Sequence, residues 1–160
     1  MSRDWSPQQA AALDEVSRWL KRRDKNEQVF RLFGYAGTGK TTLARHLAEG
    51  IKGSVVFAAF TGKAALVMRS RGCPDARTIH SLIYRPKEIE SEEPSFELND
   101  DSEAALARLI VIDECSMVDE ELGRDLLSFG VPVLVLGDPA QLPPVKGGGF
   151  FTDAEPDMML

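Results

Sequence analysis

A glycine-rich segment early in the sequence has the residues that a phosphate-binding loop requires. Residues 34–41, Gly-Tyr-Ala-Gly-Thr-Gly-Lys-Thr, fit the pattern G-x-x-x-x-G-K-S/T. Glycines allow the backbone to wrap around a phosphate chain, and the amino terminus of a following helix adds N–H donors and positive potential. We therefore predict that Lys40 contacts the β- and γ-phosphates of ATP and that Thr41 binds Mg²⁺. The other residues expected to line this loop are Gly37, Thr38, Gly39 and Thr42.

Two adjacent carboxylates follow a strongly apolar run later in the sequence. Residues 109–112, Leu-Ile-Val-Ile, have the continuous apolar character of a buried strand, and Asp113 and Glu114 come directly after them. A P-loop ATPase places its second metal-site motif at the end of such a strand. We predict that Asp113 holds Mg²⁺ through water and that Glu114 is the general base for the attacking water. A strand that ends in a solvated acidic turn is the alternative.

A proline-rich loop follows a further apolar run. The run covers residues 133–136, and the loop at 137–144 contains Gln141. The side-chain amide of Gln141 can donate a hydrogen bond to the γ-phosphate and so respond to its presence. An ordinary polar loop residue is the alternative that the spacing alone allows.

Two short segments offer hydroxyl and basic groups that suit a nucleic-acid phosphate backbone. Thr61 and Lys63 belong to the first segment, and Thr78 and His80 belong to the second. Each segment falls at an expected strand end or helix start. The two threonines could therefore act only as helix caps, and His80 could be an ordinary surface histidine.

These residues need a scaffold that brings distant segments together. Short apolar runs alternate with stretches of helical periodicity, and Ser6 and Pro7 mark the start of the first helix. This alternation predicts an α/β fold, with a parallel sheet flanked by helices. The expected strands are residues 29–33, 55–60, 109–113 and 133–136, and the expected helices are residues 8–20, 40–49, 62–70 and 118–128.

An acidic segment interrupts the alternation. Residues 85–101 contain two prolines and many acids, which fit a small inserted hairpin or a solvated loop equally well. Residues 88–103 hold eight of the 25 acids and no Lys or Arg, so without them the net charge of −6 would become +2. The overall acidity therefore does not exclude a nucleic-acid partner, which requires Lys and Arg.

Composition limits the class of protein. A length of 160 residues, with 43% hydrophobic and 28% charged residues, is typical of one globular domain. The longest apolar run, residues 55–60, is much shorter than the ~20 residues of a membrane span, and no signal-peptide core precedes it. We expect a cytoplasmic protein with no membrane partner. Its two cysteines, Cys73 and Cys115, are expected to stay reduced.

With these segments in order, the chain resembles superfamily 1 DNA helicases of the RecD-like/Dda group from about Trp5 to Val145. The segments that carry the resemblance are GYAGTGKTT (34–42), TGKAA (61–65), TIHSL (78–82), VIDECSMVD (111–119) and LGDPAQLPPV (136–145). The last is the most specific, because P-loop proteins in general lack it. Phe60 departs from the family, which usually has proline there.

The resemblance implies a single RecA-like P-loop NTPase domain over residues 1–160, with strand 133–136 between strands 29–33 and 109–113. It also implies that Gln9 reads the adenine edge, although the neighbouring Gln8 is an alternative. The family roles match Lys40 and Thr41 for phosphate and magnesium, Asp113 and Glu114 for metal and base, Gln141 for γ-phosphate sensing, and Thr61, Lys63, Thr78 and His80 for single-stranded DNA.

The function implied by the resemblance is that of the first motor domain of an ATP-dependent 5′-to-3′ DNA helicase. The insert at 85–101 falls where the family has a strand-separating hairpin. In the family a second RecA-like domain supplies arginine fingers and half of the DNA track. That domain is absent from this sequence, so the chain alone should hydrolyse ATP weakly. A catalytically incomplete module that binds nucleotide or DNA and acts with a partner is the alternative.

Overall fold

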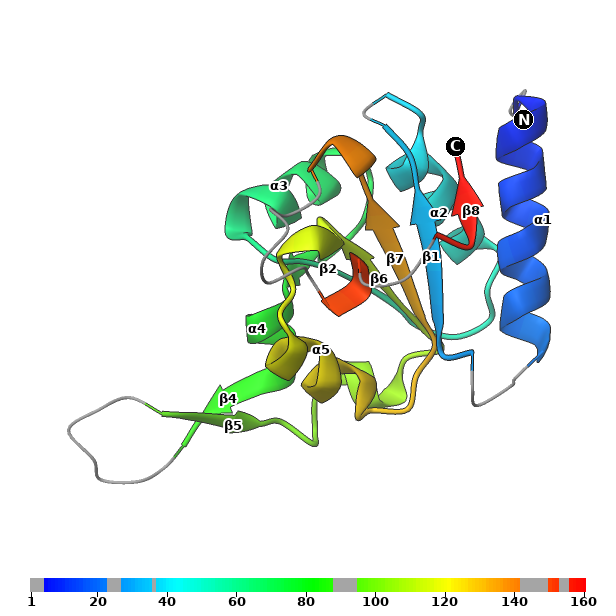
Figure 1. Ribbon diagram of the computed structural model, residues 1–160. Helices are drawn as coiled ribbons and strands as arrows, with labels where there is room; N and C mark the ends of the chain where they lie inside the picture. Colours follow the sequence, from blue (N-terminus) through cyan, green and yellow to red (C-terminus); the bar gives the residue numbers. More distant parts are fainter. Residues whose placement is uncertain (1–4, 23–26, 36, 88–94, 142–149, 153–155) are drawn as a thin grey trace.

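A parallel sheet forms the centre of the molecule in a computed structural model, which describes residues 5–22, 27–35, 37–87, 95–141, 150–152 and 156–160. Six strands of the described chain lie in the order β3-β2-β6-β7-β1-β8 (Figure 1), and all neighbours are parallel. The strands are β1 (Val29–Phe33), β2 (Val55–Ala59), β3 (Arg77–Thr78), β6 (Leu109–Asp113), β7 (Val133–Gly137) and β8 (Met158–Met159). As the resemblance implies, β7 lies between β1 and β6.

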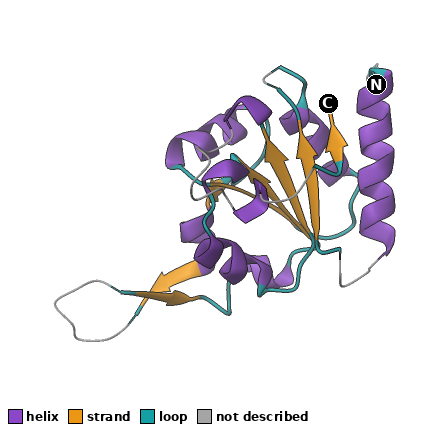
Figure 2. Cartoon of the chain, in the orientation of Figure 1, coloured by secondary structure: helices purple, strands orange, loops and turns teal. Residues whose placement is uncertain are grey.

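Helices cover both faces of the sheet, as Figure 2 shows. The first face packs against α1 (Pro7–Arg22), α2 (Lys40–Glu49) and α3 (Gly62–Ser70). The second face packs against α4 (Ile79–Ile83) and α5 (Glu120–Leu127). Short 3₁₀ turns complete the connections: η1 (Glu103–Leu106), η2 (Cys115–Met117), η3 (Pro139–Gln141) and η4 (Phe150–Thr152). Among the described residues, no helix is both long enough and apolar enough to cross a membrane.

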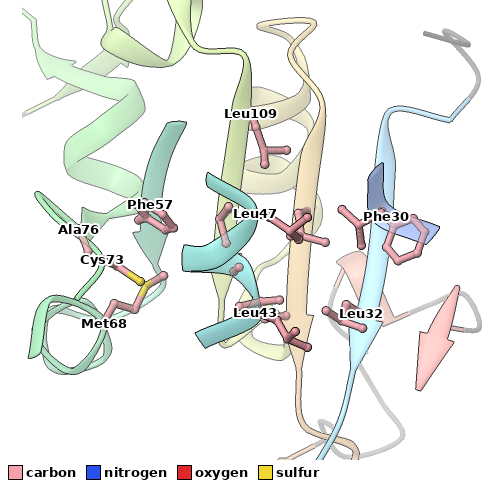
Figure 3. Close-up of a cluster of buried hydrophobic side chains, with 14 of the residues drawn as sticks. Phe30, Leu32, Leu43, Leu47, Phe57, Met68, Cys73, Ala76 and Leu109 are labelled. Atoms are coloured by element: carbon pink, nitrogen blue, oxygen red, sulfur yellow. The ribbon is translucent and has the colours of Figure 1, made fainter. Parts of the chain in front are cut away.

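Side chains that alternate along each strand separate two apolar cores. On β6, Leu109 and Val111 join the core beneath α1 to α3, whereas Ile110 and Ile112 join the core beneath α4 and α5. Figure 3 shows part of the first core, where the leucines of α2 lie over the sheet. Because both faces are covered, the central strands have the continuous apolar sequences that allowed their prediction.

The two ends of the acidic insert pair as the antiparallel strands of a hairpin. This hairpin points away from the main sheet (Figure 1). Its strands are β4 (Tyr84–Pro86) and β5 (Phe96–Leu98), so the described part of the insert is a hairpin. Residues 88–94 of the insert lie outside the described residues. Phe96 is 62% exposed and does not pack on the domain.

The base of the hairpin is joined to the domain by hydrogen bonds. Asn99 N–H donates to the carbonyl of Ile83 over 2.7 Å, and the Tyr84 hydroxyl donates to the Asp125 carboxylate on α5. Two strands alone are marginal in water, and these contacts supply the missing support.

The predicted α/β architecture is confirmed, with small shifts of boundaries. β2 ends at Ala59, one residue before the expected end. α5 begins at Glu120, two residues after the expected start, because the Asp119 side chain accepts a hydrogen bond from Leu122 N–H and caps the helix there. The short elements β3, α4 and β8 were not predicted as separate elements.

Candidate functional site

The residues predicted to act on nucleotide meet at one edge of the sheet. Parallel strands have their carboxyl ends on the same side, and ligands of open α/β sheets bind beyond those ends. Here β1 leads into the glycine-rich loop, β6 ends at Asp113, and β7 is followed by Asp138. The pairing of Phe33 with Gly137 and of Ala59 with Asp113 fixes the heights of these strand ends.

The glycine-rich loop has the conformation that its glycines allow. Gly37 and Gly39 both have φ of 85°, a backbone angle that residues other than glycine rarely adopt. Thr38 N–H donates to the carbonyl of Tyr35 over 3.2 Å, which closes the turn, while Ala36 lies outside the described residues. Gly39 directly precedes α2, so the amino terminus of a ten-residue helix follows the loop.

A backbone hydrogen bond between two further glycines holds the loop against β7. Gly34 N–H donates to the Gly137 carbonyl over 2.9 Å. A Cβ atom on Gly137 would lie 2.8 Å from the Phe33 ring and 3.1 Å from Cys115 Sγ. Glycine is therefore required at 137 for β1 and β7 to support the loop at this spacing.

Lys40 lies over the loop that precedes it. Its ammonium group donates to the carbonyl of Gly34, and to that of Tyr35 over 3.3 Å. Burial lowers the pKa of Lys40, while the carboxylates of Asp138 and Asp113 act in the opposite direction. Thr41, the next residue, is only 7% exposed, and Thr42 is half-buried. Lys40 thus lies within electrostatic reach of both carboxylates.

Asp113 and Glu114 differ in their surroundings. Burial raises the pKa of Asp113, against the effects of a 2.9 Å hydrogen bond from Glu114 N–H and of the positive charges of Lys40 and Arg71. Burial and the neighbouring Asp113 raise the pKa of Glu114, and Lys63 opposes this shift. Glu114 has φ of 56° and ψ of 47°, a left-handed conformation that is strained for glutamate. Such strain often occurs at functional sites.

A cavity of about 210 Å³ joins this acidic pair to one of the segments predicted to contact DNA. It is lined by Thr61, Lys63, Ala64, Val67, Asp113 and Glu114. The second segment lies beside Phe60, because the ring of His80 is 6.1 Å from Phe60 and 5.7 Å from Tyr84. The two segments predicted to contact DNA therefore both lie at the Phe60 end of β2.

The threonines of both segments are helix caps. Thr61 Oγ1 accepts from Ala64 N–H, and Thr78 Oγ1 accepts from Ser81 N–H, each over 3.1 Å. A hydroxyl that accepts a hydrogen bond keeps its own O–H for a second partner. The capping role is therefore present, and contact with a phosphate remains compatible with it.

Gln9 links α1 to the glycine-rich loop. Its Nε2 donates to the Thr38 carbonyl over 3.1 Å, and its Oε1 accepts from Ser6 N–H over 3.0 Å. Ser6 Oγ accepts from Gln9 N–H in return, which makes a reciprocal capping box at the helix start. Gln8, the alternative, is exposed. The side chain of Gln141 lies outside the described residues.

Two charged residues near the site were missed by sequence reasoning. Asp138 directly follows β7 and is the carboxylate with the largest effect on Lys40. The rule that identified Asp113 at a strand end could also have identified Asp138. Arg71 acts on both Lys40 and Asp113 from the end of α3, and no local sequence signal marks it.

Comparison with known proteins agrees with this geometry. The family described as an AAA domain matches residues 5–158. The chain is 33% identical over 122 residues to the ATP-dependent DNA helicase dda of Enterobacteria phage T4. This match covers 72% of this chain and 28% of that protein. It is 33% identical over 150 residues to the ATP-dependent RecD2 DNA helicase of Deinococcus radiodurans. This match covers 89% of this chain and 19% of that protein.

Solved structures show the same fold. Bacteroides sp Pif1 bound to ssDNA has a TM-score of 0.62 and 25% identity, over 94% of this chain and 38% of that chain. Bacteroides sp Pif1 in complex with ADP-AlF4 has the same TM-score and identity, over 94% and 39%. The chain spans less than a third of the length of the dda and RecD2 relatives. It belongs to the AAA domain family, as a RecA-like domain of the superfamily 1 helicase kind.

Proposed function

We propose that this chain is the nucleotide-binding motor domain of an ATP-dependent DNA helicase, which hydrolyses MgATP and moves 5′-to-3′ along single-stranded DNA. The observation that carries the proposal is the meeting of Lys40 with Asp113, the neighbour of Glu114, at one sheet edge. The similarity to the dda and RecD2 helicases supports the reaction class. The direction of movement rests on resemblance to the RecD-like/Dda group alone.

The loop and the start of α2 bind the phosphates. Backbone N–H groups of residues 37–41 and the helix dipole favour a negatively charged group there. Lys40 exchanges its contacts with the Gly34 and Tyr35 carbonyls for phosphate oxygens. Gln9 reads the adenine edge from the adjoining end of α1, where its contact with Thr38 already places it beside the loop.

The oxygen donors beside the loop fit a magnesium ion. Thr41 and Asp113 offer a hydroxyl and a carboxylate, which are the hard oxygen ligands that Mg²⁺ prefers. Among the described residues there is no cluster of three His, Cys, Asp or Glu side chains for a metal. Mg²⁺ commonly takes one or two protein ligands and completes its shell with water and phosphate. When bound, it neutralises charge that develops on the phosphate oxygens.

Glu114 activates the water that attacks the γ-phosphate. Burial and the adjacent Asp113 raise the pKa of Glu114, which makes its carboxylate a better proton acceptor than an exposed glutamate. Gln141 follows β7 at the same edge, and we assign it the sensing of the γ-phosphate.

Single-stranded DNA binds at the ends of β2 and β3 through Thr61, Lys63, Thr78 and His80. Lys63 shares a cavity with Glu114, so its ammonium group can contact either that carboxylate or a DNA phosphate. DNA that engages Lys63 thereby frees Glu114 to face the attacking water. This arrangement offers a short physical link between DNA binding and ATP hydrolysis.

Isothermal titration of MgATP into the wild-type chain and into Lys40→Ala tests the nucleotide site. We expect the variant to bind at least about tenfold more weakly, a loss of ~1.4 kcal/mol. Lys52→Ala is the matched control, because Lys52 is an exposed lysine that precedes β2 at the other edge of the sheet. Equal affinities for wild type and Lys40→Ala would contradict the assignment.

A further inference from the structure

A second cavity lies far from the nucleotide site. It is a groove of about 1010 Å³ at the amino ends of the strands. Gln28, Arg108 and Pro132 line it, and each directly precedes a strand of the parallel sheet. The nucleotide site lies at the carboxyl ends, so the body of the sheet separates the two.

The floor of the groove is apolar and held in place by hydrogen bonds. Its larger apolar residues come from α1, from α2 and the turn after it, and from the segment before β7: Leu13, Trp19, Leu20, Leu47, Ile51, Val131 and Pro132. Trp19 Nε1 donates to the Glu27 carbonyl over 2.5 Å. Gln28 Nε2 donates to the carbonyls of Leu127 and Val131 over 2.9 and 3.0 Å. These bonds form the walls before anything binds, which reduces the entropy cost of binding.

The rim of the groove is positive although the chain has a net charge of −6. Lys21, Lys52 and Arg108 are exposed and form no ion pair with any described residue. The one acid in the lining, Glu27, lies 3.7 Å from Arg22. Within the described part of the chain, the rim therefore presents three cations that form no ion pair.

Arg108 is fixed at the rim by its stem. A Cβ atom on Gly53 would lie 2.4 Å from Arg108 Cγ, so the absence of a side chain there lets the arginine stem pack on the backbone. Gly53 also has φ of 118°, which a residue with a side chain would not tolerate. The guanidinium is thus presented beside the apolar floor rather than left on a freely rotating chain.

We propose that this groove docks an acidic segment of a partner protein, with apolar side chains on the floor and carboxylates paired with Lys21, Lys52 and Arg108. The combination of a long apolar floor and a cationic rim matches an amphipathic peptide. A nucleic acid would leave the apolar floor uncovered. Two acids of the hairpin, Glu97 and Asp101, already pair with Arg85.

Amide NMR of the whole chain tests the location. The probe is a synthetic twelve-residue peptide with Leu and Phe at helical spacing among Asp and Glu, and its matched control has Ser in place of Leu and Phe. Gly50 and Gly130 line the groove and should shift saturably, while Gly37 and Gly39 of the nucleotide loop should not. No saturation up to about 1 mM peptide, a weak affinity of ~4 kcal/mol, would overturn the proposal.

Charge reversal tests the rim. Lys21→Glu with Lys52→Glu should weaken peptide binding about tenfold or more, whereas the equally charged control Arg69→Glu with Lys87→Glu should not. MgATP affinity should be unchanged in both, so the result is independent of the proposed helicase function. Equal binding by the rim variant, or by the serine peptide, would overturn the proposal. If the amide signals of Gly50 and Gly130 shift with protein concentration in the absence of peptide, the groove binds a second copy of the chain instead.

Discussion

Asp113 is a carboxylate whose surroundings act against its charge. Burial raises its pKa, although Lys40, Arg71 and the Glu114 N–H all favour the ionised form. A raised pKa means that the folded chain binds a proton more tightly than the unfolded chain does. The resulting stability is fully present below the ordinary Asp value of 3.8 and is lost as pH rises through the folded pKa.

The Asp113→Asn variant should therefore be more stable than wild type at neutral pH. Asparagine keeps an Oδ1 acceptor for Glu114 N–H and removes the buried charge. We expect a melting temperature higher by about 2–4 °C at neutral pH, as for ~1 kcal/mol in a domain of this size. The difference should shrink as pH falls below the ordinary Asp range of about 4.

Thermal melts across this pH range check the prediction, with exposed Asp100→Asn as control. A variant less stable than wild type at neutral pH would show that the attraction of Lys40 outweighs burial. MgATP binding should weaken in Asp113→Asn even as stability rises, because the same charge is proposed to hold the metal.

At this scale the sequence predicted residue types and missed tertiary contacts. Lys40, Asp113 and Glu114 could be found because each adjoins an apolar run that predicts a strand. The contact of Gln9 with Thr38 joins residues 29 apart, and only the packing of α1 beside the loop creates it. Arg71 acts on the site from the end of α3, and no pattern near Arg71 indicates this tertiary arrangement.

At the scale of elements, the base of the hairpin packs against the domain and is hydrogen-bonded to it. Leu98 packs against the second core, and Tyr84 donates to Asp125 of α5. Burial, together with this bond, raises the pKa of Tyr84. Lys87 N–H still pairs with the Ser95 carbonyl over 2.8 Å, so the two arms remain close up to these residues.

Shortening the hairpin should leave the domain stable. Replacing residues 88–94 with Asn-Gly, which suits a two-residue hairpin turn, should change the melting temperature by less than about 2 °C. In contrast, Tyr84→Phe should cost about 1 kcal/mol, because Asp125 loses its donor. Thermal melts of the two variants make the comparison. A large loss from the shortened hairpin alone would mean that residues 88–94 support the fold.

Elements could be predicted where a long local pattern exists. The strand at Leu109–Asp113 was predicted at its observed bounds because its side chains are buried on both faces. β8 has only two residues and is defined by its pairing with β1, so no sequence pattern predicts it. α4 has five residues, too few for a helical period to show.

At the scale of the whole molecule, the chain corresponds to a fraction of its relatives. It covers 28% of dda and 19% of RecD2. In the family that the sequence resembles, a second RecA-like domain supplies the arginine fingers. An arginine finger contributes about 10³–10⁵ in rate, so we propose that the complete site needs that domain.

A polypeptide of these 160 residues should therefore turn over ATP far more slowly than the typical ~10 s⁻¹, with little stimulation by single-stranded DNA. Phosphate release with and without oligo(dT) measures this, and Lys40→Ala gives the background rate. Turnover near the typical value would show that the domain is self-sufficient. Arg71 would then be the internal candidate for the arginine role, and Arg71→Ala should abolish the activity.

The strand that leads into the phosphate-binding loop finds its neighbours late in synthesis. Val29 of β1 pairs with Val133, and Leu32 pairs with Met158, each more than a hundred positions further on. At about 5–20 residues per second, a ribosome needs at least several seconds to make that intervening chain. During this time β1 has no neighbouring strand to pair with, and closing so long a loop is slow. The nascent loop should therefore acquire nucleotide affinity only after β7 has emerged, and chaperones that bind apolar segments have their main opportunity before then.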